Sequence, residues 1–242
     1  MRILIVLDNF YIPQYSGGVE SCTHELALEL AGRGHEVAVL CRLAMEGMTG
    51  LRLRALRRFF GKPYAGDRLL GYPVYRAWDV PGALDALITD FSPDVALIQN
   101  WSPVRVAGVL AARGIPAAVY LHNVFTELLD GDLRSLSGVR FIANSVFTAE
   151  RFRQILGIEA LPLPPLFRPE LYVGRRDPRN VTFINPHPKK GSHLAFEVAK
   201  LCPDIPFHFV QSWTLGEDHY ALINAKLQEL PNLTFQTRTR NM

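Results

Sequence analysis

The stretch "ILIVLDNFYIPQYSGGVESCTHELALELAGRGHEVAVLC", residues 3–41, decides the fold. It starts with an apolar run at 3–7 and ends with a second apolar run at 36–41. Between these runs, apolar side chains recur at helical spacing over 18–32, and glycines end that pattern. Two strands that are apolar throughout, joined by a helix, predict neighbouring parallel strands buried on both faces of a sheet.

The same alternation continues along the chain. Further strands are predicted at 74–78, 94–99, 117–122, 140–144 and 159–163, with helices at 81–91, 103–113 and 145–156. This order predicts an α/β fold with a doubly wound, Rossmann-like parallel sheet that helices cover on both faces. In such a sheet, ligands bind at the carboxyl ends of the strands, so polar residues that follow a strand are candidates for a site.

A proline-rich, charged stretch at 163–180 separates this pattern from a second one. The second pattern runs strand, helix, strand, helix, strand at 181–185, 192–201, 206–211, 216–229 and 233–237. We therefore predict two domains, residues 1–170 and 171–242. The second domain holds only about half of the strands of a Rossmann-like domain and is incomplete.

The composition argues against several classes of protein. The net charge of +3 is too small to indicate a nucleic-acid partner. No apolar run approaches the roughly 18 residues of a membrane-spanning helix, and the N-terminus is interpreted as a strand, not a signal peptide. The three cysteines, Cys22, Cys41 and Cys202, lack metal-type spacing and indicate reduced thiols, so we expect a cytoplasmic protein.

A pair of glycines, Gly17 and Gly18, lies between the first strand and the first helix. Glycine lets a ligand approach the backbone closely, and the free amides at a helix N-terminus favour a phosphate. A tight turn with nothing bound is the alternative. The patterns G-x-G-x-x-G and G-x-x-x-x-G-K are absent here, which disfavours an NAD enzyme or an NTPase.

His122 ends a predicted strand, where it could donate to a substrate oxygen or transfer a proton; a structural histidine is the alternative.

Lys189 and Lys190, in "PKKG" at 188–191, could neutralise a phosphate beside a helix N-terminus, or could be exposed loop lysines. The Asp130-Gly131-Asp132 stretch is interpreted as a turn, and no metal-ligand spacing occurs.

The segment 51–62, "LRLRALRRFFGK", does not fit the alternation. Its basic and apolar residues are mixed in a way that can lie on an anionic membrane surface. A solvated helix or loop is the other interpretation. The protein would accordingly be cytoplasmic, or peripheral at the inner face of the membrane.

Together, "GGVE…LALELAGRGHEV", the strand-ending His122, "FIANSVFTAERF" and "PKKG" resemble the retaining GT-B glycosyltransferases of family 4, over the whole chain. The resemblance implies an N-terminal acceptor-binding domain and a C-terminal nucleotide-sugar-binding domain. It also implies hexosyl transfer from a nucleotide-sugar donor to a hydroxyl of a glycan, lipid or small molecule, with retained configuration and without a metal. Sugar-nucleotide epimerases of the same fold are an alternative, which the glycine pair and "GHEV" disfavour.

The resemblance also implies roles for single residues. Gly17 and Gly18 would lie against the donor phosphates, His122 would contact the transferred sugar, and Lys190, with Lys189 beside it, would hold the diphosphate. Asn185 stands where the family usually has an arginine, and it is the remaining candidate for the diphosphate.

One family feature is missing from the 242 residues. No two glutamates are eight positions apart, although the family carries such a pair. We therefore expect a complete acceptor domain and a truncated donor domain, whose open sheet edge would pair with a second copy or a partner chain, be covered by the first domain, or be mobile. A binding half that depends on a partner, or a non-catalytic relic of a transferase, is the alternative to an active enzyme.

Overall fold

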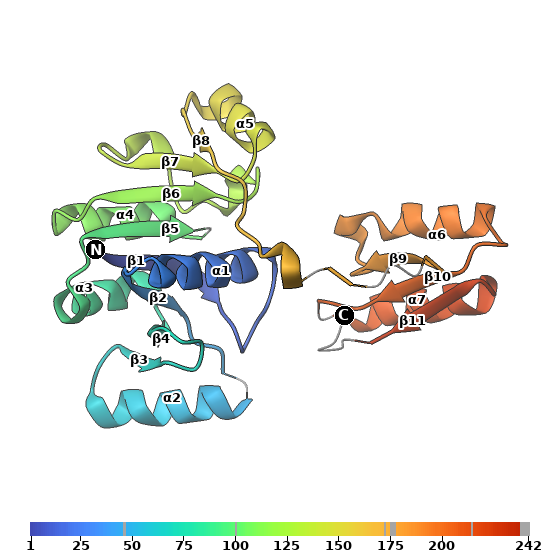
Figure 1. Cartoon of the computed structure of the whole chain (residues 1–242), viewed down its shortest axis with the longest axis horizontal. Helices are drawn as coiled ribbons and strands as arrows, with labels where there is room; N and C mark the ends of the chain where they lie inside the picture. Colours follow the sequence, from blue (N-terminus) through green and yellow to red (C-terminus); the bar gives the residue numbers. More distant parts are fainter. Residues whose placement is uncertain (46, 100, 172, 175–177, 214, 238–242) are drawn as a thin grey trace. The chain divides into compact units, whose positions relative to one another are not determined.

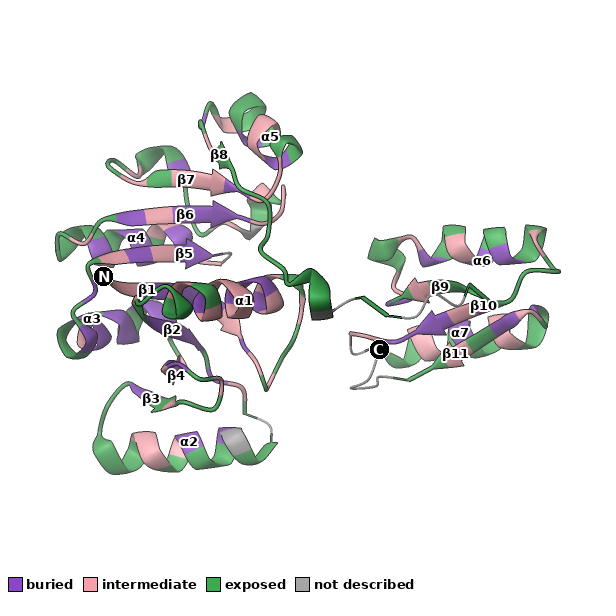
Figure 2. Ribbon diagram, viewed as in Figure 1, coloured by how far each residue is buried: buried purple, intermediate pink, exposed green. Residues whose placement is uncertain are grey.

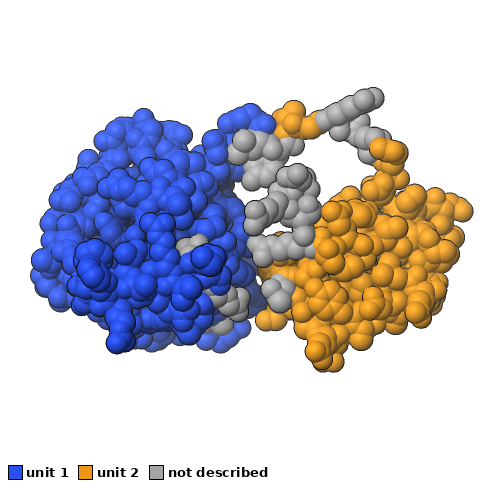
Figure 3. Space-filling model, turned by 90° about the horizontal axis from the view of Figure 1, so that it is seen from below, with its two compact units in different colours: residues 1–171 blue, residues 172–242 orange. Residues whose placement is uncertain are grey.

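The computed structural model describes the chain except for residues 46, 100, 172, 175–177, 214 and 238–242. The chain divides into two compact units, residues 1–171 and 172–242, which Figure 3 colours separately. Each unit has its own sheet and its own buried core. The acceptor- and donor-binding roles of residues 1–170 and 171–242 stay predictions.

The first unit contains an eight-stranded sheet in the order β3-β4-β2-β1-β5-β6-β7-β8 (Figure 1). Its strands are β1 (Arg2–Phe10), β2 (Glu36–Arg42), β3 (Tyr64–Asp67), β4 (Val74–Ala77), β5 (Val95–Gln99), β6 (Ala117–Leu121), β7 (Arg140–Ala143) and β8 (Leu161–Pro162). Its α-helices are α1 (Gly18–Gly32), α2 (Gly47–Phe60), α3 (Val80–Phe91), α4 (Pro103–Ala112) and α5 (Val146–Leu156). The predicted Rossmann-like α/β architecture is confirmed.

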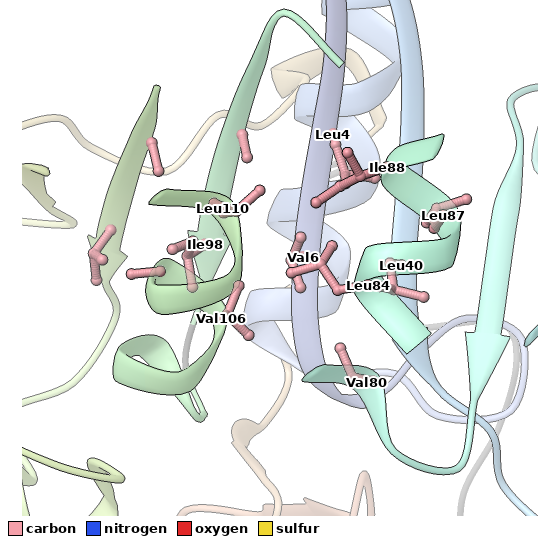
Figure 4. Close-up of a cluster of buried hydrophobic side chains, with 14 of the residues drawn as sticks. Leu4, Val6, Leu40, Val80, Leu84, Leu87, Ile88, Ile98, Val106 and Leu110 are labelled. Atoms are coloured by element: carbon pink, nitrogen blue, oxygen red, sulfur yellow. The ribbon is translucent and has the colours of Figure 1, made fainter. Parts of the chain in front are cut away.

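The two faces of this sheet bury alternate residues of each strand. In β1, Leu4 and Val6 are buried in the layer that contains α3 and α4, whereas Ile5 and Leu7 are buried in the layer that contains α1. Figure 4 shows part of the first layer, in which Leu84 of α3 lies beside Val6. Because helices cover both faces, the central strands are apolar throughout and do not alternate between apolar and polar residues.

The edge at β3 corrects the prediction of an all-parallel sheet. β3 pairs antiparallel with β4, whereas the other neighbouring pairs are parallel. The strand has only four residues and ends in Gly66 and Asp67, both poor strand formers, which hides it from sequence analysis. The segment 51–62 is helical as far as Phe60, and Leu53 anchors it beside this edge by packing with Leu43.

The second unit has a three-stranded parallel sheet in the order β11-β10-β9. Its elements are β9 (Val181–Ile184), α6 (Ser192–Leu201), β10 (Phe207–Val210), α7 (Glu217–Glu229) and β11 (Leu233–Gln236). Phe209 of β10 is fully buried in a cluster with Phe196 of α6 and Ile223 of α7. The predicted strand–helix alternation is confirmed, and pairing of its sheet edge with another chain stays a prediction.

Candidate active site

The strand order of the large sheet reverses between β1 and β5, so a ligand crevice is expected outside the carboxyl ends of these strands. Asp8, near the end of β1, is almost fully buried there. Its carboxylate accepts hydrogen bonds from Ser102 Oγ at 2.6 Å and from Arg42 Nη2 at 2.8 Å. Ser102 has a φ of 55°, which is uncommon for serine, so its backbone is held in a strained conformation beside Asp8.

His122 directly follows β6, the next strand along the same edge. Its Nε2 lies 2.7 Å from Oε1 of Gln99, the last residue of β5. Its ring lies 4.2 Å from the ring of Tyr120, and its main-chain oxygen accepts a hydrogen bond of 2.9 Å from Asn144 Nδ2. Burial lowers the pKa of His122 to about 4, so the imidazole is neutral at neutral pH.

A small pocket opens beside His122. Its wall includes Trp101, Asn123 and Phe125 as well as His122 and Tyr120. The His122 side chain is therefore neither sealed in the core nor bonded only to backbone.

Gln99 is fully buried, and its Nε2 has no hydrogen-bond partner among the residues that the structure describes. A buried donor without a partner is unfavourable by about 1–3 kcal/mol. Because Gln99 Oε1 accepts from His122 Nε2–H, the Nδ1 atom of His122 is the acceptor nitrogen of the ring. The Gln99–His122 pair is thus a place where a ligand could complete the hydrogen bonding.

The glycine pair follows β1 on the same edge and begins α1, as predicted from its place in the chain. Gly17 has an extended backbone with φ −152°, so no sharp turn requires glycine there. A Cβ on Gly17 would lie 2.6 Å from Glu20 Oε2, whereas the space around Gly18 is open. The group that lies close to Gly17 is therefore the Glu20 carboxylate of the chain itself.

Glu20 changes the electrostatics expected at this helix start. Its buried carboxylate accepts a hydrogen bond of 2.9 Å from Asn9 Nδ2, and burial raises the pKa of Glu20. An ionised carboxylate at this position would repel a phosphate. Gly17, the N-cap residue of α1, makes no side-chain cap hydrogen bond. The contact of Gly17 and Gly18 with donor phosphates stays a prediction.

Two of the sequence motifs help to hold this edge of the sheet in place. Asn144, within "FIANSVFTAERF", holds the His122 carbonyl and accepts a hydrogen bond of 2.6 Å from Thr148 Oγ1. Asp130 accepts hydrogen bonds of 2.9 Å from the backbone amides of Val104 and Arg105, at the start of α4. Its carboxylate therefore stabilises a helix N-terminus.

In the second unit, Asn185 directly follows β9, at the carboxyl edge of the small sheet. It is almost fully buried and has a φ of 64°. Its Oδ1 accepts from the Trp213 amide at 3.1 Å, while its Nδ2 has no partner among the described residues. A strained backbone together with an unpaired buried amide is typical of a ligand site.

Lys189 and Lys190 are exposed in a short 3-10 helix, Pro188–Lys190, that precedes α6. The Lys190 ammonium lies 5.2 Å from the centre of the Trp213 ring. Gly191 then adopts a φ of 81° and is the N-cap residue of α6. The structure thus brings Asn185 and Lys190 together through Trp213, beside a helix N-terminus that favours anions.

A pair of histidines extends this cluster. The His187 and His219 rings stack with centres 4.9 Å apart, and His187 contacts the Trp213 ring edge-on at 5.6 Å. Desolvation first, then His219 and Lys189, lowers the pKa of His187. The imidazoles, the indole and the lysines offer an aromatic and cationic surface of the kind that suits a nucleoside diphosphate.

Sequence analysis missed several of these residues. For Gln99 and Asp8, the available signal was a polar residue at the end of an otherwise apolar strand. His187 and Trp213 lie in two loops and His219 lies in the first turn of α7, so only the fold brings them together and no spacing could indicate them. Within the described part of the chain, no three His, Cys, Asp or Glu side chains are grouped so that they could hold a metal ion.

A sequence model of the family described as Glycosyltransferase Family 4 matches residues 16–163. This range is more than half of the chain and contains Gly17, Gly18 and His122. No curated protein matches the chain significantly.

Solved structures resemble the chain over nearly its whole length. The catalytic domain of starch synthase IV from Arabidopsis thaliana has a TM-score of 0.60 at 12% identity, covering 99% of this chain and 74% of that one. The α,α-trehalose 6-phosphate synthase from Burkholderia multivorans has a TM-score of 0.59 at 10% identity, covering 99% and 72%. UDP-GlcNAc 2-epimerase from Neisseria meningitidis has a TM-score of 0.56 at 12% identity, covering 99% and 73%. These likenesses show a GT-B fold, which is shared by synthases and an epimerase.

Proposed function

Because the chain belongs to glycosyltransferase family 4, we propose that it takes part in the transfer of a hexose from a nucleotide-sugar donor to an acceptor hydroxyl with retained anomeric configuration, a transfer that the 242 residues alone are not expected to complete. The observation that supports this most is the neutral His122 imidazole, held by Gln99 at the carboxyl edge of the sheet. The acceptor is a glycan, a lipid or a small molecule that carries a free hydroxyl.

His122 is proposed to position the donor sugar. With Nε2 engaged by Gln99, the Nδ1 atom can accept a hydrogen bond from a sugar hydroxyl. A pKa of about 4 leaves little imidazolium at neutral pH, so the ring does not serve as a general acid there. Its contribution to the rate is the orientation of the reacting carbon.

The second unit is proposed to hold the diphosphate of the donor. In the transfer, the bond from the anomeric carbon to the diphosphate oxygen breaks, a bond to the acceptor oxygen forms, and the proton of the acceptor hydroxyl passes to an oxygen of the leaving diphosphate. Negative charge develops on the leaving diphosphate. Lys190, Lys189 and the unpaired Nδ2 of Asn185 supply cations and a hydrogen-bond donor for that charge.

A sugar-nucleotide epimerase is the second candidate, because the Neisseria meningitidis epimerase shares the fold. The family match over residues 16–163 favours the transferase. The two activities differ in a simple way, since an epimerase converts the nucleotide sugar without an acceptor. A non-catalytic half that binds ligand only with a partner chain is the third candidate.

The proposal is tested by calorimetric titration of the chain with UDP-, GDP- and ADP-sugars. We expect one nucleotide class to bind, and Lys190→Ala to weaken that binding by about tenfold or more, as expected for loss of a charge-assisted contact. Lys200→Ala, which removes an exposed lysine from the end of α6, is the matched control and should bind as the unchanged chain does. No binding of any nucleotide sugar at millimolar concentration, or equal loss in both variants, would contradict the proposal.

A further inference from the structure

Helix α2 packs on the first unit through one face only. Leu53 is fully buried beside Leu43 and Ala65, and Leu56 and Trp78 pack against this cluster. The helix lies beside the edge strand β3, and Figure 2 shows much of its surface as exposed. The outer face of α2 is therefore exposed.

That outer face is apolar along its length. Met48, Leu51, Ala55 and Phe59 are separated by three, four and four positions, so they share one side of the helix. Met48 is 82% exposed, Leu51 56% and Phe59 83%, and Phe60 beside them is 66% exposed. Scattered apolar side chains are ordinary on a protein surface, but a continuous strip along a helix marks an interaction site.

Arginines flank the strip on both sides. Arg52 lies one turn after Met48, and Arg58 lies two turns after Leu51, so each borders the strip from a different side. Among the described residues, neither of these two arginines forms an ion pair.

The other cations of the segment are engaged by the protein. Lys62 pairs with Asp90, the Arg57 guanidinium lies 5.5 Å from the Trp78 ring, and Arg54 donates to main-chain oxygens. No acidic residue occurs between positions 47 and 63. The outer face thus combines an apolar strip with unpaired positive charge and no negative charge.

This combination of apolar and basic residues favours one of the possible binding partners of the outer face. A second copy of the chain, docked through the same face, would bring Arg52 and Arg58 against their own counterparts with no acid on either helix to pair them. An anionic bilayer offers both an apolar layer and phosphates at the depth of the arginines. At 14 residues the helix is too short to cross a bilayer, and among the described residues no helix is both long and apolar enough to do so.

We propose that α2 docks the protein on an anionic phospholipid surface, with Met48, Leu51 and Phe59 entering the headgroup boundary and Arg52 and Arg58 pairing with lipid phosphates. The helix lies in the plane of the interface, and its buried side keeps its contacts with Leu43 and Ala65. One apolar strip and two free cations give reversible attachment. This inference does not depend on the proposed sugar transfer.

The test is co-sedimentation of the full chain with vesicles. One preparation contains phosphatidylcholine alone and the other contains phosphatidylcholine with an equal amount of phosphatidylglycerol. We expect binding to the anionic vesicles only, weakened at high salt because screening acts on the exposed arginines. The double variant Arg52→Glu/Arg58→Glu and the single variant Phe59→Ser should each lower the partition coefficient by about tenfold or more.

Helix α5 provides matched controls. Phe147 is 71% exposed there, and Arg151 lies one turn later on an exposed site. Phe147→Ser and Arg151→Glu should bind vesicles as the unchanged chain does, and far-UV circular dichroism checks that every variant is folded. Equal binding to neutral vesicles, equal loss in the α5 controls, or retention of binding in both α2 variants would overturn the proposal. So would concentration-dependent dimerisation through α2 in sedimentation, without vesicle binding.

Discussion

The chemistry of His122 is set by its surroundings, and it can be tested at that single residue. Its pKa of about 4 lies below the 6.5 of an exposed histidine. The unfolded chain therefore binds a proton near pH 6.5, and the folded chain binds it only near pH 4. The free energy of unfolding should fall as the pH is lowered through this window, and His122 should cause no further loss below it.

At about 1.4 kcal/mol per pKa unit, the loss from His122 amounts to a few kcal/mol. Urea unfolding at pH 7 and pH 4.5 measures it, with His122→Gln as the comparison, because the variant should lose less stability on acidification. NMR titration of the ring protons checks the same point. A His122 signal that titrates near pH 6.5 would show that burial does not hold the ring neutral.

The two adjacent glycines should respond differently to substitution. Gly17→Ala places a methyl group against the held carboxylate of Glu20 and should destabilise the protein by about 1–3 kcal/mol. Gly18→Ala meets open space at the first position of α1 and should be neutral or stabilising by up to about 1 kcal/mol. Urea unfolding of both variants measures the difference. Equal effects would mean that Glu20 does not approach Gly17 as described.

Single residues also show what a sequence can and cannot reveal about a site. His122, Asn185 and Lys190 could be proposed as site residues because each lies between a recognisable strand and the helix that follows it. The hydrogen-bond partners of these side chains could not be identified from the sequence. Gln99 reaches His122 across 23 positions and Trp213 reaches Asn185 across 28, and only the strand order brings each pair together.

At the level of elements, α3 packs its buried face against the sheet of the first unit. Leu84 is fully buried in the layer shown in Figure 4. Leu84→Ala should lower the free energy of unfolding by about 2–5 kcal/mol, because it removes buried methyl groups and leaves a cavity. Leu51→Ala on the exposed face of α2 is the matched control, with an expected effect within about 0.5 kcal/mol. Urea denaturation that finds comparable losses would contradict this packing.

The elements predicted best are those whose burial leaves a pattern in the sequence. β1, β2 and β5 are continuous apolar runs because helices cover both of their faces. β3 leaves no such pattern, since it is short, lies at the edge and ends in Gly66 and Asp67. The helical state of 51–62 depends on the packing of Leu53, which the sequence alone does not show.

For the molecule as a whole, we expect that the 242 residues alone do not transfer sugar. The sequence contains no pair of glutamates eight positions apart, which is the pair that the resemblance to family 4 implies for donor binding. Losing contacts to the remote parts of a donor lowers the rate as well as the affinity. A radiolabelled transfer assay with nucleotide sugars measures this. Transfer to any acceptor, with donor binding tighter than about 10 μM, would contradict the expectation.

The central claim is that His122 contacts the sugar of a nucleotide-sugar donor, and calorimetry of His122→Ala tests it most directly. The variant and the unchanged chain are each titrated with the nucleotide sugar that binds and with the corresponding nucleoside diphosphate. The account predicts that the variant binds the nucleotide sugar about tenfold more weakly, the effect of losing about one good hydrogen bond, and binds the nucleoside diphosphate unchanged. Unchanged binding of both ligands by a folded variant, or equal weakening of both, would contradict the account.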